Sequence, residues 1–243
     1  MHITALTHIG HVRSENQDKY CVHKYNTDEC LVVVADGMGG HKFGSIASNI
    51  VIDKIAEYMK NQRQSYENFK NNISQALVNG IDIANNAILE WADRHDVDNG
   101  MGSTVVVCYV HKNIVYIAYV GDSRAYLIRN KDIIRLTRDH SITQLINSFE
   151  LDRVCNENKN INKNMITKAV GMEKNSKFIG DSVCIDYKPN DNILMCTDGL
   201  TNELDDSEIL EVILKERFIV NKLIDKANDR NSSDNITAVL IKL

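Results

Sequence analysis

The distribution of apolar residues along the chain predicts short strands that alternate with longer helices. Short runs rich in valine, isoleucine and other apolar residues are typical of strands: Lys19–His23, Leu31–Ala35, Ser103–Val110, Ile114–Val120, Ala125–Arg129, Ile133–Leu136, Val183–Tyr187, Ile193–Cys196 and Ile236–Ile241. Polar turns at 111–113, 130–132 and 188–192 each join two successive runs. Strands joined in this way predict hairpins, and therefore antiparallel sheets.

Two long segments between the early and middle strands carry apolar residues at helical spacing. In Ser45–Met59 apolar side chains recur at every fourth residue, and Phe69–Trp91 continues the same stripe. Such a stripe is the core-facing side of a helix. Two shorter segments, Ser207–Glu216 and Val220–Asp229, predict helices before the last strand. Helices in blocks and strands in hairpins indicate an α+β fold, with helices packed outside one or two antiparallel sheets.

Composition excludes several functional classes. The chain has 243 residues, of which 43% are hydrophobic and 25% charged, an ordinary globular balance that suits one large domain or two small ones. A net charge of −5 without a segment rich in lysine and arginine argues against a nucleic-acid partner. The longest apolar stretch, Thr104–Gly121, is interrupted at 111–113, and a membrane span needs roughly 18 unbroken apolar residues. The N-terminal residues lack the regions of a signal peptide, so we expect a cytoplasmic protein.

Cysteine spacing favours free thiols. None of the six cysteines forms a CxxC pair, so a zinc site has little support. Apart from Cys30 and Cys155, they lie inside apolar runs predicted as strands: Cys21, Cys108, Cys184 and Cys196. We expect buried free thiols in a reducing compartment.

Aspartate recurs at the ends of the predicted strands. Five positions share this context: Asp18 before a strand, Asp36 and Asp198 after a strand and before a glycine, Asp122 after a strand and a glycine, and Asp234 before the last strand. Each one alone is explained as a turn former. Together, strand ends from distant parts of the chain can bring carboxylates to one rim, where they repel unless a cation neutralises them. Oxygen-only ligands favour Mg²⁺ or Mn²⁺ over zinc.

Two further features have competing explanations. The glycine-rich turn Asp36–His41 could hold a phosphate on backbone N–H groups, but its spacing is not GxGxxG and no parallel βαβ series follows. Arg13 is a lone arginine, and such residues are usually solvated. Because it precedes Asp18, it could instead clamp a phosphate with two hydrogen bonds.

Short motifs occur in order over nearly the whole chain: GHVRSENQD at 10–18, VADGMGGH at 34–41, Gly44 with Ala47 and Ser48, GST at 102–104, VGDSRA at 120–125, LTRDHS at 136–141, AVG at 169–171, CTDGLT at 196–201 and DNIT at 234–237. This series resembles the metal-dependent protein phosphatases of type 2C, in their compact bacterial form. Each motif is short, but so many in one order are highly specific.

The resemblance implies one catalytic domain over residues 1–243, folded as a four-layer α-β-β-α sandwich with a flap at about 142–168. It implies two Mn²⁺ or Mg²⁺ ions bridged by Asp36, with the Gly37 carbonyl as a further ligand. The resemblance also implies that Asp198 and Asp234 hold the first ion and that Gln17 and Asp18 act through bound waters. By the same resemblance, Asp122 contributes to a weaker third ion and Arg13 binds the substrate phosphate.

Some residues depart from the pattern of that family: His8, Gln17, Ser45, Lys168 and Asn202. Glutamate is frequent at the positions of Gln17 and Ser45, and arginine at that of Lys168. An acidic residue is frequent at the position of His8, and some members place one near Asn202 for the third ion. These departures leave the principal ligands in place and bear on the third ion and on specificity linked to the flap.

The resulting hypothesis is hydrolysis of phosphoserine and phosphothreonine in proteins by a water that bridges two cations, in one in-line step without a phosphoenzyme. His41 is a candidate acid for the leaving group, although a metal-bound water could serve instead and His41 could be structural. The expected partners are phosphoproteins, including a serine/threonine kinase, with neither nucleic acid nor membrane, and we expect a monomer. No Cys-x5-Arg loop of a tyrosine phosphatase is present.

Two alternative functions follow from the same resemblance. One is a catalytically silent pseudophosphatase that serves as a regulatory binding module; it would be marked by lost ligands, and the main ligands are all present. The other is a sporulation or stress-response phosphatase that acts on anti-sigma-factor antagonists, a branch whose members usually carry further domains.

Overall fold

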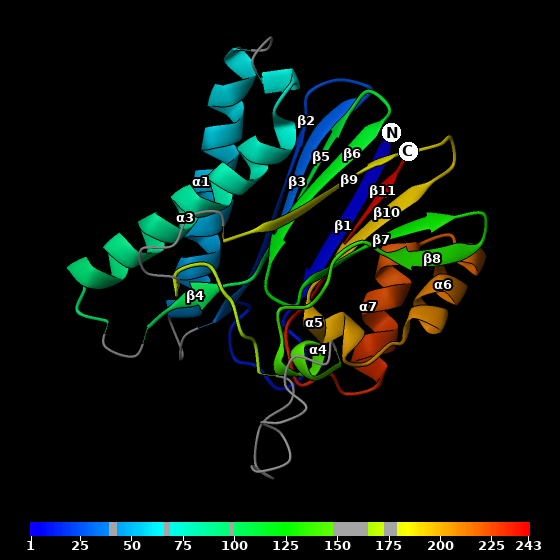
Figure 1. Cartoon of the computed structure of the whole chain (residues 1–243). Coiled ribbons are helices and arrows are strands. Elements are labelled where there is room, and N and C mark those ends of the chain that lie inside the picture. The colour runs from blue at the N-terminus through cyan, green and yellow to red at the C-terminus, as the bar shows by residue number, and fades with distance from the viewer. Residues whose placement is uncertain (39–42, 66–68, 98–99, 148–164, 173–178) are drawn as a thin grey trace.

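Two antiparallel β-sheets stack face to face, and helices cover the outer face of each (Figure 1). The computed structural model spans residues 1–243 and describes all of them except 39–42, 66–68, 98–99, 148–164 and 173–178. This arrangement confirms the expected α+β class and the four-layer α-β-β-α sandwich. No helix in the described ranges is long and apolar enough to cross a membrane.

The sheets mix strands from distant parts of the chain. The first, called here the β1 sheet, has the order β1 (His2–His8), β11 (Ile236–Lys242), β10 (Asn192–Cys196), β7 (Arg124–Arg129) and β8 (Asp132–Arg135). The second, the β3 sheet, has the order β2 (Asp18–Lys24), β3 (Glu29–Met38), β5 (Val105–His111), β6 (Ile114–Val120) and β9 (Asp181–Asp186), and β4 (Gly102–Ser103) pairs with the end of β3.

Helix pairs form the outer layers. The long helices α1 (Phe43–Gln64) and α3 (Ile73–Arg94) pack on the β3 sheet through the predicted apolar stripe. Helices α5 (Asp198–Thr201), α6 (Asp206–Lys215) and α7 (Ile219–Asp229) pack on the β1 sheet. The short helix α4 (Ile142–Asn147) lies near the end of the sandwich where α5 begins (Figure 1).

The unbroken apolar runs of the central strands follow from this layering. In β3, Leu31 and Val33 pack on the side of α1 and α3, whereas Val32 and Val34 face the other sheet. Both faces of the strand are therefore buried, so both the odd and the even positions are apolar. A strand with one solvated face would alternate instead.

The predicted hairpins are confirmed in two cases and wrong in the third. Strands β5 and β6 pair directly, as do β7 and β8. Strands β9 and β10 lie in different sheets, so turn 188–192 crosses between the layers. The carboxylate of Asp191 explains this path, because it accepts hydrogen bonds from the Lys188 N–H (2.7 Å) and from Arg129 of β7 (2.6 Å) and so fixes the turn against the β1 sheet.

Several element ends differ from the prediction. Strand β1 was not predicted, because its residues mix polar and apolar types. Helix α3 begins at Ile73 rather than Phe69, although the Phe69 ring still packs edge-on against Tyr109, with ring centroids 5.3 Å apart. The thiol of Cys184 is exposed, contrary to expectation, because it lies on the outer face of the edge strand β9. Cys155 lies outside the described residues.

One difference bears on the candidate chemistry. Strand β3 continues beyond Ala35 to Met38, so Asp36 lies inside the strand rather than after its end. The cause is pairing: Gly37 and Met38 pair with Ser103 and Gly102 of β4. The predicted strand over 103–110 is correspondingly divided into β4 and β5.

Candidate functional site

The five aspartates singled out from the sequence come together around Asp36. Helix α5, which begins with Asp198, lies at the end of the sandwich away from both chain termini (Figure 1). Asp18 begins β2 and Asp36 lies in β3, both in the β3 sheet. Asp122 lies on the connection from β6 to β7, and Asp198 and Asp234 lie next to strands of the β1 sheet, after β10 and before β11. Each of the other four carboxylates acts on the pKa of Asp36 through its charge. The expected convergence of strand ends from both sheets is therefore what the structure shows.

Two of the carboxylates are direct cross-strand neighbours. Asp18 of β2 pairs with Asp36 of β3. Like charges at directly opposed positions destabilise a sheet. Burial, reinforced by Asp18 and the other carboxylates, raises the pKa of Asp36 well above its ordinary value. This pair is stable as two anions only with a nearby positive charge.

Asp18 is held through one of its oxygens. Its side chain is buried, and the hydroxyls of Thr197 and Thr237 donate to its Oδ2 over 2.9 and 2.7 Å. Burial raises the pKa of Asp18 to about 7, against the effect of the two hydroxyl donors. Its Oδ1 is buried without a hydrogen-bond partner.

The donor set fits divalent cations such as Mn²⁺ or Mg²⁺. Within the described ranges, buried carboxylate oxygens without a partner occur on Asp18, Asp122 and Asp198. Native proteins rarely leave such atoms unsatisfied, and all the candidate donors are hard oxygens. No three acidic, histidine or cysteine side chains of the described part are already grouped so that they could hold a metal ion.

Gly37 lies where two backbone segments meet. Its N–H donates to the carbonyl of Gln17 over 3.2 Å, and a Cβ at this position would lie 2.0 Å from the carbonyl oxygen of Gly44. Any side chain would separate β3 from the start of α1. The hydroxyl of Ser48 on α1 also donates to the Gln17 carbonyl, over 2.6 Å. Gly37 is thus required for packing, and the role of its carbonyl as a ligand stays a prediction.

Arg13 lies at the site and is hydrogen-bonded to the segment that carries Asp234. Its Nη2 donates to Oδ2 of Asp234 over 2.7 Å, and its Nε donates to the Ser233 carbonyl over 3.2 Å. The hydrogen bond to Asp234 raises the pKa of Arg13, so the guanidinium stays charged. Its side chain is 51% exposed, and exposed ion pairs contribute little stability. A phosphate group could therefore compete for this guanidinium.

Several small polar side chains hold the loops that carry the site, and no individual role was predicted for them. The amide of Asn235 donates to the carbonyls of Ile9 (2.8 Å) and Glu15 (3.0 Å), and its Oδ1 accepts from the Gln17 N–H over 2.8 Å. It thereby fixes the loop that contains Arg13. The signal available in the sequence was that Asn235 lies in a quoted motif, directly after Asp234.

Thr104 links the end of β3, which carries Asp36, to the turn that carries Asp122. Its hydroxyl accepts from the Asp36 N–H over 3.1 Å and lies 2.7 Å from the hydroxyl of Ser123. Its own N–H donates to the Asp36 carbonyl over 2.8 Å. Thr104, which lies between β4 and β5, therefore bonds both the N–H and the carbonyl of Asp36.

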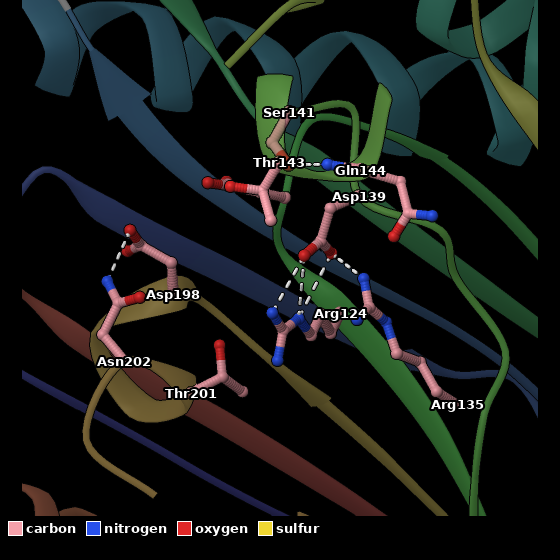
Figure 2. Close-up of a pocket in the computed structure, with 10 residues that line it drawn as sticks. Arg124, Arg135, Asp139, Ser141, Thr143, Gln144, Asp198, Thr201 and Asn202 are labelled. Atoms are coloured by element: carbon pink, nitrogen blue, oxygen red, sulfur yellow. Dashed lines mark hydrogen bonds and ion pairs between the residues drawn. The ribbon is translucent and has the colours of Figure 1, made fainter. Parts of the chain in front are cut away.

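A cavity of about 200 Å³ is lined by Asp122 and Asp198 and by Thr143 and Gln144 of α4. Figure 2 shows Arg124 and Arg135 both directed at Asp139 on its wall, with Arg124 Nη2 2.8 Å from Asp139 Oδ2. Burial, followed by the charges of Asp198 and Asp139, raises the pKa of Asp122 to about 7.

Asn202 lines the same cavity next to Asp198. Its amide donates to Oδ2 of Asp198 over 3.0 Å (Figure 2). Burial, and then Asp234, raise the pKa of Asp198, and the Asn202 bond lowers it. Asn202 thus donates a neutral amide to Asp198, near the position where some members of the resembled family place an acidic residue for a third ion.

Some predicted positions do not join this cluster. His41 and residues 148–164 of the predicted flap lie outside the described residues, so the acid role stays a prediction. Lys168 is exposed. His8 contributes to the loop before Arg13, because its Nδ1 accepts from the Gly10 N–H over 3.0 Å.

Comparison with known proteins agrees with this geometry. A family model described as Protein phosphatase 2C matches residues 7–240. The serine/threonine phosphatase stp of Listeria welshimeri is 32% identical over 246 residues, which cover 100% of this chain and 96% of the relative.

Solved structures show the same fold. The serine/threonine phosphatase PstP/Ppp of Mycobacterium tuberculosis aligns with a TM-score of 0.83 at 25% identity, covering 100% of this chain and 98% of that one. A structure of the catalytic domain of PstP in complex with two manganese ions aligns with a TM-score of 0.76 at 25% identity, covering 98% and 96%. With the family model matched over residues 7–240, the chain belongs to the protein phosphatase 2C family.

Proposed function

We propose that this protein hydrolyses phosphoserine and phosphothreonine in other proteins with the help of two Mn²⁺ or Mg²⁺ ions. The observation that carries the proposal is the meeting of five aspartates from two sheets at one rim, three of them with a buried oxygen that has no partner. Membership of the protein phosphatase 2C family gives this acidic rim its chemical interpretation.

The proposed ligands divide between the two sheets. Asp36 would be shared by the two ions, with the Gly37 carbonyl as a further ligand, and Asp198 and Asp234 would hold one of them. Gln17 and Asp18 act through water, and Asp122 serves a weaker third ion. When bound, the ions activate a water for attack on phosphorus and neutralise charge on the phosphoryl oxygens.

The remaining roles belong to groups that orient the substrate or move a proton. Arg13 exchanges its bond to Asp234 for two hydrogen bonds to the substrate phosphate, which fixes the phosphorus in line with the attacking water. His41 is the candidate donor of a proton to the serine or threonine oxygen that leaves. The alternative of a pseudophosphatase is not supported, because every proposed aspartate ligand is present.

The proposed setting is cytoplasmic. We expect the protein to act as a monomer and to oppose a serine/threonine kinase whose phosphorylated activation loop is one substrate. The PstP structure with two manganese ions supports the choice of metal in that relative, and it motivates Mn²⁺ as the first metal to test here.

The test is a set of matched peptides that carry phosphothreonine, phosphoserine or phosphotyrosine in one sequence, assayed with Mn²⁺. The expected result is a higher kcat/KM for phosphothreonine and phosphoserine than for phosphotyrosine, with Asp36→Asn inactive on all three. A clear preference for phosphotyrosine would contradict the substrate class. Equal rates for the wild type and Asp36→Asn would contradict the proposed site.

A further inference from the structure

His140 lies between the turn that carries Asp122 and the segment that begins at α4. The Gly121 N–H donates to Nδ1 of His140 over 3.0 Å, and the His140 N–H donates to the Gly121 carbonyl over 2.9 Å. The side chain and the backbone of one residue therefore bond both polar groups of Gly121. The His140 side chain is 10% exposed, so water competes little for these bonds.

The Gly121 backbone has a conformation that depends on such support. Its φ of +104° lies in the left-handed region, and a Cβ there would lie 2.6 Å from Cγ2 of Thr104. Asp122 follows directly, so the Gly121 carbonyl that His140 bonds belongs to the peptide that carries the Asp122 N–H, and the clamp fixes the backbone from which the Asp122 carboxylate extends. On the other side of Asp122, the Ser123 hydroxyl lies 2.7 Å from the Thr104 hydroxyl.

The imidazole is itself held in one orientation. Because Nδ1 accepts from Gly121, the hydrogen of the neutral ring lies on Nε2, which donates to Oδ2 of Asp181 over 3.0 Å. The ring also stacks on Tyr119, with centroids 5.5 Å apart and 17° between the planes. The His140 carbonyl accepts from the Thr167 N–H over 2.8 Å. Both ring nitrogens make directed bonds, which a side chain that served only to fill space would not need.

We propose that His140 is a positioning residue that acts through Nδ1, fixing the Gly121 peptide and thereby directing the Asp122 carboxylate into the divalent-cation site. The inference rests on the proposed function, because it takes Asp122 as a ligand. Its structural basis is the Gly121 clamp together with the Oδ1 atom of Asp122, which is buried without a partner. Orienting groups of this kind commonly change metal affinity by about 10–100-fold when they are removed.

Two substitutions separate the two nitrogens of the ring. In His140→Asn, the amide oxygen can occupy the place of Nδ1 and accept from Gly121. In His140→Gln, the longer amide can reach toward Asp181, but the acceptor for Gly121 is lost. Asp181→Ala is the matched control, because Asp181 is 55% exposed and water can replace it at Nε2.

The measurement is calorimetric titration of the metal-free full chain with Mn²⁺. We expect His140→Gln to weaken Mn²⁺ binding at its weakest site by about tenfold. His140→Asn, as the conservative rescue, and Asp181→Ala are expected to stay within about twofold of the wild type. Turnover of p-nitrophenyl phosphate by His140→Gln should recover at saturating Mn²⁺, a recovery that general misfolding would not allow.

Hydrogen exchange gives a second readout that needs no metal. The Gly121 amide should exchange slowly in the wild type and His140→Asn, and about tenfold faster in His140→Gln. If His140→Gln does not fold, His140→Ala replaces it, since alanine also lacks the acceptor. Equal Mn²⁺ affinity in the Asn and Gln variants would overturn the proposal, as would a loss that saturating Mn²⁺ does not restore. Failure of the proposed function would instead appear as a wild type that is inactive with Mn²⁺.

Discussion

At the scale of single residues, two acidic side chains of the site, Asp18 and Asp198, are held through one oxygen and left without a partner at the other. Hydroxyls bond Oδ2 of Asp18 and an amide bonds Oδ2 of Asp198, while Oδ1 of each is buried without a partner. Buried polar atoms without partners reduce stability, and they are retained where function needs them. This half-satisfied pattern is what we expect of side chains that complete their bonding with a cation or its water.

Substitution of Asp36 should separate activity from stability. Asp36→Asn removes one of two opposed buried carboxylates, so the metal-free protein should gain about 1 kcal/mol, which raises Tm by about 2–4 °C. Turnover should fall by at least about 100-fold, because the proposed bridging ligand is lost. Thermal unfolding in EDTA and steady-state assays with Mn²⁺ check the two effects. Asp53→Asn, on the exposed face of α1, is the control. Near-normal kcat for Asp36→Asn would refute the bridging role.

Arg13 gives the second prediction at this scale. A charge-assisted hydrogen bond contributes about 1.5–3 kcal/mol, so Arg13→Ala should lower kcat/KM for phosphopeptides by about 10–100-fold. Arg13→Lys should recover only part of the loss, because an ammonium cannot form the paired contact. The exposed Arg94 at the end of α3 serves as the control position. Unchanged KM and kcat in Arg13→Ala would return this residue to a surface role.

At the scale of elements, β3 is anchored at both ends by polar contacts. At its start, away from the site, Glu29 is buried and receives the Arg63 guanidinium of α1 in two bonds of 2.9 and 2.7 Å, together with the hydroxyl of Tyr109. The Arg63 guanidinium also lies 3.8 Å from the centroid of the Tyr25 ring. Burial alone would raise the pKa of Glu29, but the Arg63 and Tyr109 bonds outweigh it and lower that pKa.

Glu29→Gln should therefore destabilise the fold in a pH-dependent way. Breaking this pair should lower the free energy of unfolding by about 2 kcal/mol near neutral pH, less than for a fully buried pair because Arg63 is 28% exposed. A lowered folded pKa means that the contribution is complete above the unfolded value of about 4.3 and disappears as the pH falls through the folded value. Denaturant unfolding between about pH 7 and pH 3 should show the two proteins converging in stability.

The matched control for this prediction is Glu57→Gln on α1, the helix that carries Arg63. Glu57 is 66% exposed and lies 3.7 Å from Lys54, so its loss should change stability by at most about 0.5 kcal/mol. A constant difference between the wild type and Glu29→Gln over the acidic range would show that the Glu29 charge contributes no stability.

The elements that the sequence predicts well are those with one dominant signal. Strand β6 is found with its predicted ends, because Ile114 to Val120 is an apolar run between polar turns. Strand β1 carries no such signal, because its residues His2 to His8 mix polar and apolar types, as suits a partly exposed strand at the edge of its sheet. The third hairpin failed because local turn chemistry does not record which sheet each flanking strand joins; here the long-range bond from Arg129 to Asp191 decides it.

The candidate site was also predicted unevenly. The strand-end aspartates could be identified because each one lies within two residues of the end of an apolar run. The positions of Thr104 and Asn235 as supports could not, since their partners Asp36 and Gln17 lie far away in the chain. His140 belongs to a quoted motif, but only the fold places it against Gly121.

At the scale of the whole molecule, the site spans both sheets. Asp36 comes from the β3 sheet, whereas Asp198 and Asp234 come from the β1 sheet, and the apolar layer between the sheets holds them in place. Cations bound at this rim would therefore join the two halves of the sandwich. Binding to the folded state alone raises its stability by mass action.

Mn²⁺ should consequently stabilise the protein as a whole. At a Mn²⁺ concentration of about 100 times Kd the gain is about 2.7 kcal/mol, which corresponds to a rise in Tm of about 5–10 °C. The shift should be much smaller in Asp36→Asn. Calorimetry over a series of Mn²⁺ concentrations checks this, and a Tm that does not depend on Mn²⁺ would argue against a site shared by the two sheets.

The central claim is that hydrolysis depends on cations held by this acidic rim. Its most direct test is the rate of phosphothreonine peptide hydrolysis by protein stripped exhaustively with EDTA, followed along a titration with Mn²⁺. The account predicts no measurable turnover in the stripped protein, and activity that rises with Mn²⁺ in the wild type but not in Asp36→Asn. Full activity of the stripped protein without added metal would contradict it.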